Sequence, residues 1–416
     1  MSEVTARPWP IEVRFLRLLA TRLHEYGTAA HRLENAVSSA AERLGCHCDV
    51  FSTPTSVFLS FRDETDPTGT QDAYPTMMIR LRPGSVDLGK LRAVDEIADE
   101  VAAGTIDLDE GAERLLAVPN MPPVAPLWGQ LLSWAVVGAT VAALLGSTWT
   151  DIGIATVLGL LAGTITTLLG GRWQDSGSFE PLVAFLVTVA AYGLSALAGG
   201  ASVPNVVIGA LIILMPGLDL TVAVTELSTG HLASGTARFA GALVVLLKLA
   251  LGVMLATQLM TGIGLASGVP ADPQALSAGW FVWVSMLAAG LAFAVLFAAQ
   301  RRDWIAVVVA AMVSFITNTL ATQALGPEVG VFLAALVVAA VSNGYARLFN
   351  RPATVMRTPG IILLVPGSLG YRALNFLFSR NIEDGLDAAV SVTVILAALV
   401  GGLLLGNTFI APRRNL

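Results

Sequence analysis

The sequence predicts a multi-pass α-helical membrane protein with ten transmembrane helices in an inverted 5+5 repeat, preceded by a small α+β soluble domain. Three observations support this fold class. First, 55% of the 416 residues are hydrophobic and only 13% are charged, about half the charged share of soluble proteins. Second, apolar runs long enough to cross roughly 30 Å of hydrocarbon recur after residue 126. Third, two of these runs contain a Pro-Gly pair, and the pairs are 150 positions apart.

Composition and charge exclude several classes of function. A soluble core could not use so many apolar residues without exposing large patches, so the excess faces the lipid bilayer. The net charge is −6, and the chain contains no basic patch suited to nucleic acid. Cys46 and Cys48 flank His47, a spacing that fits neither a disulfide framework nor a common zinc motif. We therefore expect no nucleic-acid partner, no metal and no cofactor.

Residues 1–118 are predicted to form a cytoplasmic α+β domain. Arg14, Arg17 and Arg22 interrupt the first apolar stretch, so no cleavable signal peptide is expected. Hydrophobic periodicity indicates the helices, and Asp87 and Asp107 are suited to cap two of them. The predicted helices are 11–23, 30–44, 87–103 and 107–116, and the predicted strands are 48–52, 56–61 and 76–81.

A linker at 119–126 holds four prolines and separates this domain from the membrane part. The first five-helix repeat is assigned to 127–262, a loop to 263–279 and the second repeat to 280–416. The predicted spans are 127–146, 151–169, 181–199, 204–227, 237–260, 280–299, 304–320, 328–349, 353–376 and 386–410. The 40 glycines allow tight helix packing within or between protomers. Both a monomer and a homo-oligomer are therefore compatible with the sequence.

The arginines predict that both termini lie in the cytoplasm and that the protein sits in the inner (cytoplasmic) membrane. With the first domain inside, nine arginines fall on the cytoplasmic side and two fall outside. The nine are Arg172, Arg238, Arg301, Arg302, Arg347, Arg351, Arg357, Arg413 and Arg414, and the two are Arg372 and Arg380.

The repeat is indicated by residues 211–217, LIILMPG, which resemble 361–367, IILLVPG. Gly235 and Gly385 keep the same offset of 150 positions. Five spans in each repeat would make the second half run through the bilayer in the opposite direction. Such inverted repeats are common in secondary transporters. The alternative is an old duplication in a channel or scaffold.

The two Pro-Gly pairs are the first candidate binding residues. Pro216 and Pro366 each remove a backbone donor, and Gly217 and Gly367 loosen the chain further. Inside a membrane the freed backbone groups need partners, and they could bind the ammonium and carboxylate of a small zwitterion. A simple kink packed by a neighbouring helix is the alternative.

Five polar side chains inside or at the end of the spans complete the candidate substrate and ion pathway. Asp219 and Glu226 are candidates for proton relay or for contact with a substrate amine, although Glu226 could equally be solvated at the cytoplasmic interface. Lys248 is costly near the centre of a span unless paired, and Asp219 is the expected partner. Asn318 and Asn343 line the pathway or simply join helices by hydrogen bonds.

Several motifs resemble the threonine/serine exporter (ThrE) family, in an order that covers nearly the whole chain. These motifs are Glu25-Tyr-Gly27, His31-Arg-Leu-Glu34, the helix end at 41–45, the turn at 53–55, the Pro-Gly at 216–217 and Val365-Pro-Gly-Ser368. The resemblance implies a cytoplasmic soluble domain, ten spans, and export of threonine and serine driven by the proton gradient. It also makes Gly27, Arg32 and Glu34 signature positions of the soluble domain, without assigning them a role.

Three functions follow from these observations. The first, which we favour, is an exporter of small hydroxy amino acids coupled to protons, and not an enzyme. The second is a membrane-anchored, hydrolase-like enzyme with catalysis in the N-terminal domain, an option that the family resemblance suggests. The third is a channel or scaffold with a regulatory soluble domain.

Asp219 departs from the family pattern, in which that position is often apolar or small.

Overall fold

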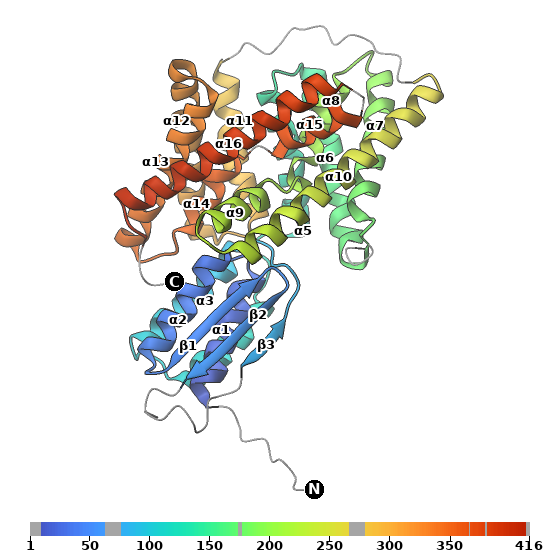
Figure 1. Ribbon diagram of the computed structural model, residues 1–416. Coiled ribbons are helices and arrows are strands. Elements are labelled where there is room, and N and C mark those ends of the chain that lie inside the picture. The colour runs from blue at the N-terminus through green and yellow to red at the C-terminus, as the bar shows by residue number, and fades with distance from the viewer. Residues whose placement is uncertain are drawn as a thin grey trace.

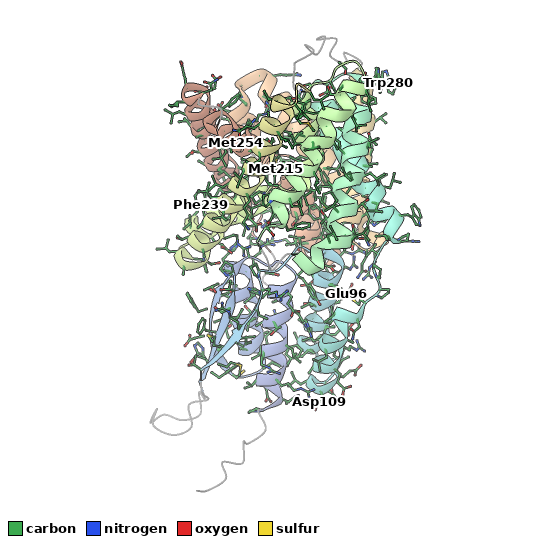
Figure 2. All side chains as sticks on the ribbon, turned by 90° about the vertical axis from the view of Figure 1, so that its right-hand side faces the viewer. Glu96, Asp109, Met215, Phe239, Met254 and Trp280 are labelled. Carbon is green, nitrogen blue, oxygen red and sulfur yellow. The ribbon has the colours of Figure 1, made fainter. Side chains whose placement is uncertain are left out.

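The computed structural model describes residues 10–62, 76–173, 177–265, 279–365, 367–378 and 381–412. Figure 1 shows a helical bundle above a small N-terminal α+β unit. Figure 2 gives the side view: Asp109 lies at the lower end of the unit, Glu96 near its junction with the bundle, and Trp280 at the opposite end of the bundle.

Among its described residues, the N-terminal unit contains four α-helices and a three-stranded antiparallel sheet in the order β1-β2-β3. Its elements are α1 (Ile11–Glu25), α2 (Ala30–Arg43), β1 (His47–Thr53), β2 (Ser56–Arg62), β3 (Met77–Arg80), α3 (Leu88–Ala102) and α4 (Leu108–Ala117). The predicted elements are therefore confirmed to within about two residues, the usual uncertainty at an element's ends. As expected, the carboxylates of Asp87 and Asp107 accept hydrogen bonds from the first turns of α3 and α4.

One face of each helix in the unit packs on the sheet or on a neighbouring helix. Five of the side chains in this core are at most 1% exposed: Phe15, Leu19, Leu33, Leu59 and Val94. Burying such side chains stabilises the folded unit by about 1.5–3 kcal/mol each. The unit thus has a hydrophobic core of its own.

The bundle consists of long helices and two interrupted ones. They are α5 (Leu127–Leu144), α6 (Trp149–Trp173), α7 (Phe179–Leu197), α8 (Val203–Leu211), α9 (Gly217–Ser228), α10 (Leu232–Gly262), α11 (Gly279–Leu296), α12 (Trp304–Leu325), α13 (Pro327–Phe349), α14 (Thr354–Ile362), α15 (Gly367–Phe378) and α16 (Ile382–Phe409). Within the described ranges, eight are long and apolar enough to cross a membrane. The bent pair formed by residues 203–214 and 217–228 makes a ninth candidate.

The predicted count of ten spans is not established by these helices. The span expected at 353–376 is divided into α14 and α15, and it is not among the nine candidates. The long apolar helices nevertheless identify the chain as a membrane protein. The outer surface of α10 agrees with this, because it exposes leucines at intervals of about one helical turn: Leu243, Leu247, Leu251, Leu255 and Leu259.

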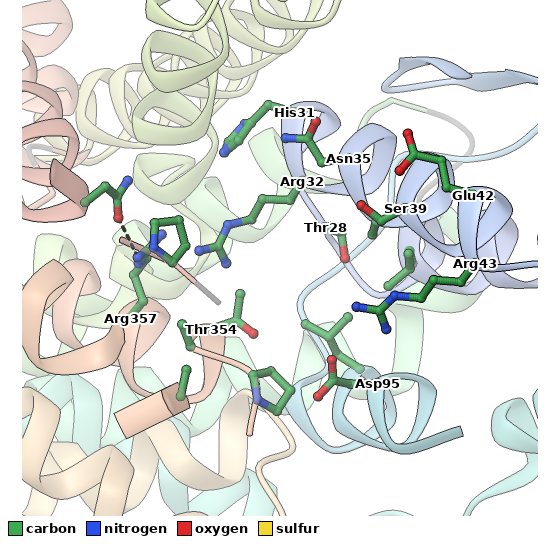
Figure 3. Close-up of a pocket in the computed structure, with 18 residues that line it drawn as sticks. Thr28, His31, Arg32, Asn35, Ser39, Glu42, Arg43, Asp95, Thr354 and Arg357 are labelled. Atoms are coloured by element: carbon green, nitrogen blue, oxygen red, sulfur yellow. Dashed lines mark hydrogen bonds between the residues drawn. The ribbon is translucent and has the colours of Figure 1, made fainter. Parts of the chain in front are cut away.

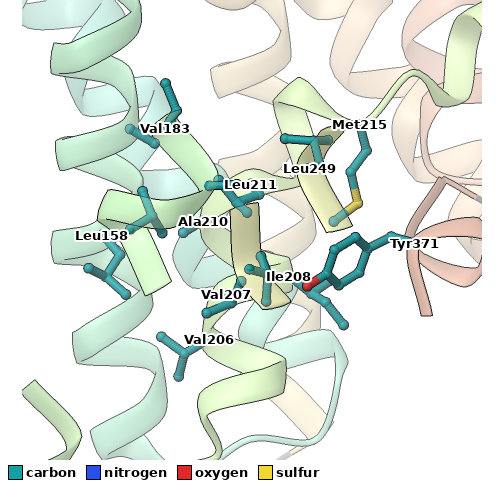
Figure 4. Close-up of a cluster of buried hydrophobic side chains, with 14 of the residues drawn as sticks. Leu158, Val183, Val206, Val207, Ile208, Ala210, Leu211, Met215, Leu249 and Tyr371 are labelled. Atoms are coloured by element: carbon teal, nitrogen blue, oxygen red, sulfur yellow. The ribbon is translucent and has the colours of Figure 1, made fainter. Parts of the chain in front are cut away.

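A large core cluster of the bundle lies where α8 packs on α5, α6 and α7, and α10 joins it by packing on α7. Figure 4 shows Leu158, Val183, Leu211 and Leu249 in this cluster, which Tyr371 of α15 joins. Lipid is as apolar as leucine, so close packing rather than water exclusion holds such helices together. A Cβ on Gly138 would lie only 2.6 Å from the carbonyl oxygen of Ala155, so glycine is what lets α5 approach α6.

Candidate functional site

The two helix breaks expected from the sequence lie against each other. The first follows a short 3-10 helix, and α9 restarts at Gly217. A Cβ on Gly367, the first residue of α15, would lie 3.4 Å from the Cα of Gly217. Met215, next to the first break, lies midway along the bundle in Figure 2. Pro366 lies outside the described residues.

The charged residues of the bundle pair differently from the expectation. Arg238 of α10 contacts Asp219 at 3.3 Å, and the Asp219 side chain is 54% exposed. Lys248 instead contacts Glu180 of α7 at 3.5 Å. The predicted pair of Asp219 and Lys248 is therefore wrong. Asp219 lies on α9, whereas Glu180 lies on α7. Lys248 is nearly three helical turns further along α10 than Arg238, so its side chain cannot reach the acid that Arg238 contacts.

Glu226 is fully buried at the junction of the bundle with the N-terminal unit. One of its oxygens accepts a hydrogen bond from the backbone N–H of Ala30 at 2.9 Å, and the other accepts one from the Ser234 hydroxyl at 2.8 Å. Arg238 adds a contact at 3.4 Å. The alternative of a solvated Glu226 is therefore wrong. Because Ala30 begins α2, the carboxylate also satisfies one of the free N–H groups of that helix, at its positive end.

Glu34, one of the signature positions, joins the same junction. One of its oxygens accepts a hydrogen bond from the backbone N–H of Ser52 at 2.8 Å, and the other contacts His231 Nε2 at 3.0 Å. Gly27, a second signature position, has φ of +79°, and a Cβ there would lie 3.0 Å from the Val86 nitrogen. Glycine is thus needed for the turn at position 27. Through its contact with His231, Glu34 ties the N-terminal unit to the start of α10.

A second polar contact ties α3 to the start of α12, at the same junction of the N-terminal unit with the bundle. Asp303, which is 1% exposed, contacts the guanidinium of Arg92 and also that of Arg351, the latter at 2.9 Å. Asp303 precedes α12 and Arg351 follows α13. The N-terminal unit is thus held by charged groups from both the first and the second set of bundle helices.

A cavity of about 620 Å³ lies between the N-terminal unit and the bundle. Its walls come from α2 and α3 on one side and from α14 and the end of α16 on the other. Figure 3 shows Arg32 and Arg357 extending toward each other in this cavity, whereas Glu42, Arg43 and Asp95 lie on the right of the view. Arg32 is the third signature position.

Arg357 is oriented by two amides. Its Nη2 donates to Asn343 Oδ1 at 2.6 Å and to Asn407 Oδ1 at 2.9 Å. Asn343 is fully buried and itself donates to Asn407 and to the carbonyl of Ile410, so it joins α13 to the end of α16. Asn318 lies elsewhere, where α12 meets α13, and a Cβ on Gly330 would be 3.1 Å from its Oδ1.

The cavity wall carries positive charge without a matching carboxylate contact. Within the described residues, neither Arg32 nor Arg357 forms an ion pair with an acid, and Arg357 Nε has no hydrogen-bond partner. Burial lowers the pKa of Arg32 to about 10, which leaves it charged at neutral pH. Burial, assisted by the charge of Arg32, lowers the pKa of His31 to about 3, so His31 is neutral there.

The His31 imidazole should make the protein lose stability in mild acid. The unfolded chain binds a proton below pH 6.5, whereas folded His31 does so only near pH 3. Stability is therefore intact above pH 6.5 and falls between pH 6.5 and about 3. From pH 6.5 to 5 this amounts to about 2 kcal/mol. We expect the free energy of unfolding to fall by about 2 kcal/mol less in His31→Gln than in wild type between pH 6.5 and 5, as measured by thermal unfolding. His47→Gln, at the exposed end of β1, is the control, and an unchanged pH dependence in His31→Gln would contradict the prediction.

Sequence reasoning missed Arg357, Arg238 and His231 as site residues. Arg357 counted only toward the orientation of the chain, although it falls inside the predicted span 353–376. An ionisable residue inside a span is a functional candidate by default, and that rule would have found it. The described residues contain no group of three His, Cys, Asp or Glu side chains placed to hold a metal ion.

Comparison with known proteins gives one consistent result. A family model described as "Putative threonine/serine exporter" matches residues 14–260, and a second, "Threonine/Serine exporter, ThrE", matches residues 282–409. The chain is 25% identical over 391 residues to a "Probable threonine/serine exporter" of Mycobacterium tuberculosis, covering 91% of this chain and 72% of that protein. It is also 25% identical to the "Threonine/serine exporter" of Corynebacterium glutamicum, covering 89% of this chain and 76% of that one.

Fungal relatives are longer. The chain is 25% identical over 392 residues to "Pheromone-regulated membrane protein 10" of Saccharomyces cerevisiae, covering 91% of this chain and 48% of that protein. The chain thus spans about half the length of that relative. No solved structure matches the chain.

Proposed function

Because this chain belongs to the threonine/serine exporter family, we propose that it exports small hydroxy amino acids, threonine and serine, from the cytoplasm. The same membership confirms the resemblance found in the sequence motifs. In this proposal the protein lies in the inner membrane with both termini in the cytoplasm, and export is coupled to the proton gradient. The observation that carries the proposal is the contact between Gly217 and Gly367, close in sequence to Met215, which Figure 2 places midway along the bundle.

Two helix N-termini converge at that contact, because α9 and α15 begin at Gly217 and Gly367. The N-terminus of a helix attracts negative charge, and the N–H groups of its first turn lack partners inside the helix. Broken helices near the membrane midplane bind substrates in other transporters in this way. A neutral amino acid with one carboxylate suits such a site, and the pathway we propose runs past both breaks.

The arrangement of the helices supports the proposed inverted repeat of five and five spans. Helices α9 and α15 have 12 residues each and start 150 positions apart. Packing contacts repeat as well. A Cβ on Gly252 would lie 2.3 Å from the carbonyl oxygen of Pro181, and a Cβ on Gly402 would lie 2.2 Å from that of Phe332. Gly252 and Gly402 are 150 positions apart, and Pro181 and Phe332 are 151 apart. Two exchangeable gates around one site would follow from such a repeat.

Proton coupling would need an ionisable group that changes its contacts during transport. Lys248 of the long apolar helix α10 pairs with Glu180 of the neighbouring helix α7. Ionisable pairs inside a membrane commonly mark ion pathways. Glu226 is a poorer candidate, since three donors already hold it. The hydrolase alternative is not proposed, because no observation on the described residues favours it.

Inside-out membrane vesicles test this proposal. With an acidic lumen, vesicles containing the protein should accumulate labelled threonine or serine, and an ionophore that collapses the gradient should stop the accumulation. Vesicles made without the protein are the control. Uptake that is the same with and without the gradient would contradict proton coupling, and the absence of any uptake would contradict export of these amino acids.

A further inference from the structure

We propose that the cavity between α2 and α14 is a cytoplasmic waiting site for the substrate, in which Arg32 and Arg357 bind the carboxylate of the amino acid. This proposal rests on the proposed function and adds a second substrate contact to it, away from the contact of the two breaks. The signature position Arg32 thereby receives a role that its sequence context does not reveal.

The charge balance of the cavity is the first argument. A buried cation is costly unless it is paired and hydrogen-bonded. Arg92, only 3% exposed, obeys this rule through its contacts with Asp303 and Glu96. Arg32 and Arg357 have no such acid within the described residues. An anion in the cavity would supply the missing charge to both.

The orientation of Arg357 is the second argument. Asn343 and Asn407 hold its Nη2, which fixes the plane of the guanidinium while its Nε stays free of partners in the described part of the chain. A planar guanidinium that is already fixed loses little freedom on binding a carboxylate. Arg32 approaches the same space from the N-terminal unit (Figure 3). A carboxylate between them would bridge the unit and the bundle.

The size and the opposite wall of the cavity favour an amino acid over a simple anion. A volume of about 620 Å³ falls in the range of small-ligand sites. Glu42 and Asp95 line the side away from Arg32 and Arg357, together with Arg43. Carboxylates on that side attract an ammonium group, and like charges repel a second anionic group. The cavity thus offers charges of both signs, one for each charged group of a zwitterion.

Calorimetric titration of the purified full chain in detergent tests the site. Threonine should bind, and threonine amide, which keeps the ammonium but lacks the carboxylate, should bind at least about tenfold more weakly. Arg32→Gln and Arg357→Gln should each weaken threonine binding by about tenfold or more, the usual effect of losing a hydrogen bond to a charged group. Arg17→Gln removes an exposed arginine of α1 and should leave binding unchanged.

A measurement on the unaltered protein protects the test against misfolded variants. Threonine should slow the modification of Arg32 by phenylglyoxal, read by mass spectrometry, and should leave the rate at Arg17 unchanged. Inorganic phosphate that binds as tightly as threonine would overturn the proposal, since the site would then be one for anions in general. Equal threonine affinity in wild type and both glutamine variants, with no protection of Arg32, would overturn it as well.

The outcomes separate this inference from the proposed function. Gradient-driven threonine uptake that is unaffected by Arg32→Gln and Arg357→Gln would overturn the waiting site and leave the exporter function intact. Threonine binding that depends on both arginines, in a protein that transports no amino acid in vesicles, would support the site and overturn the export function.

Discussion

Replacing Gly217 with leucine should abolish amino-acid uptake into inside-out vesicles, to less than about one hundredth of the wild-type rate. A Cβ at this position would already lie 2.2 Å from Val365 Cγ1 and 3.5 Å from the Cα of Gly367. A full leucine side chain therefore cannot fit while the two breaks touch. Overpacking costs about 1–3 kcal/mol even where neighbours can adjust, and here it would hold apart two segments that are proposed to form the substrate site.

Three companion variants show whether the effect is local. Gly241→Leu places the same side chain on an open stretch of α10, where a Cβ meets nothing within 4 Å, and should transport normally. Gly217→Ala should lose part of the activity, and a second change, Val365→Ala, should restore it by removing the atoms that clash. Normal uptake by Gly217→Leu in correctly folded protein would show that the contact between the breaks is not part of the transport route.

Glu226→Ala should weaken the docking of the N-terminal unit on the bundle. The carboxylate is fully buried and accepts hydrogen bonds from Ala30 and Ser234, and its loss leaves Arg238 with only the exposed Asp219. Removing one partner of a buried charged network costs roughly 3–5 kcal/mol. We expect the low end of that range, because Asp219 still contacts Arg238. The fall should appear as a lower Tm in detergent and as faster proteolysis of the linker 119–126.

Two further variants, Glu226→Gln and Glu113→Ala, show how much of the lost stability is due to the buried carboxylate. Glutamine keeps the shape, its one amide oxygen can still accept from the Ala30 N–H, and its amide nitrogen can donate to the Ser234 hydroxyl. It should therefore lose about half as much stability, because it gives up the charge and the contact with Arg238. Glu113 is exposed on α4, and its change to alanine should leave Tm and proteolysis as in wild type. If Glu226→Ala is as stable as Glu113→Ala, the buried carboxylate does not hold the unit in place.

Much of the fold could be predicted because its signals are local. Asp87 and Asp107 cap helices that begin one residue later, and the turn around Pro54 joins two strands that pair along their full length. The break before Gly217 follows from a proline that cannot continue the preceding helix. In each case the cause and the effect lie within a few residues, so a single sequence contains both.

The candidate site could be predicted only in part, because its contacts join distant segments. The hydrogen bond from Ala30 to Glu226 spans 196 positions, and no local pattern indicates it. The cavity likewise combines Arg32 from α2 with Arg357 from α14. The wrong partner for Lys248 has a related cause: helical spacing says which residues share a face, but not which neighbouring helix that face meets.

The contact between Arg92 and Asp303 has a consequence for how the protein is made. Ribosomes add about 5–20 residues per second, and domains generally fold as soon as they emerge. Because Asp303 follows Arg92 by 211 positions, the N-terminal unit would wait about 10–40 s for its partner. During that interval its docking face presents Arg92 and the first N–H groups of α2 and α3, which water solvates well. These polar groups are solvated until the bundle is complete, so they reduce the apolar area that the waiting unit exposes to other unfinished chains.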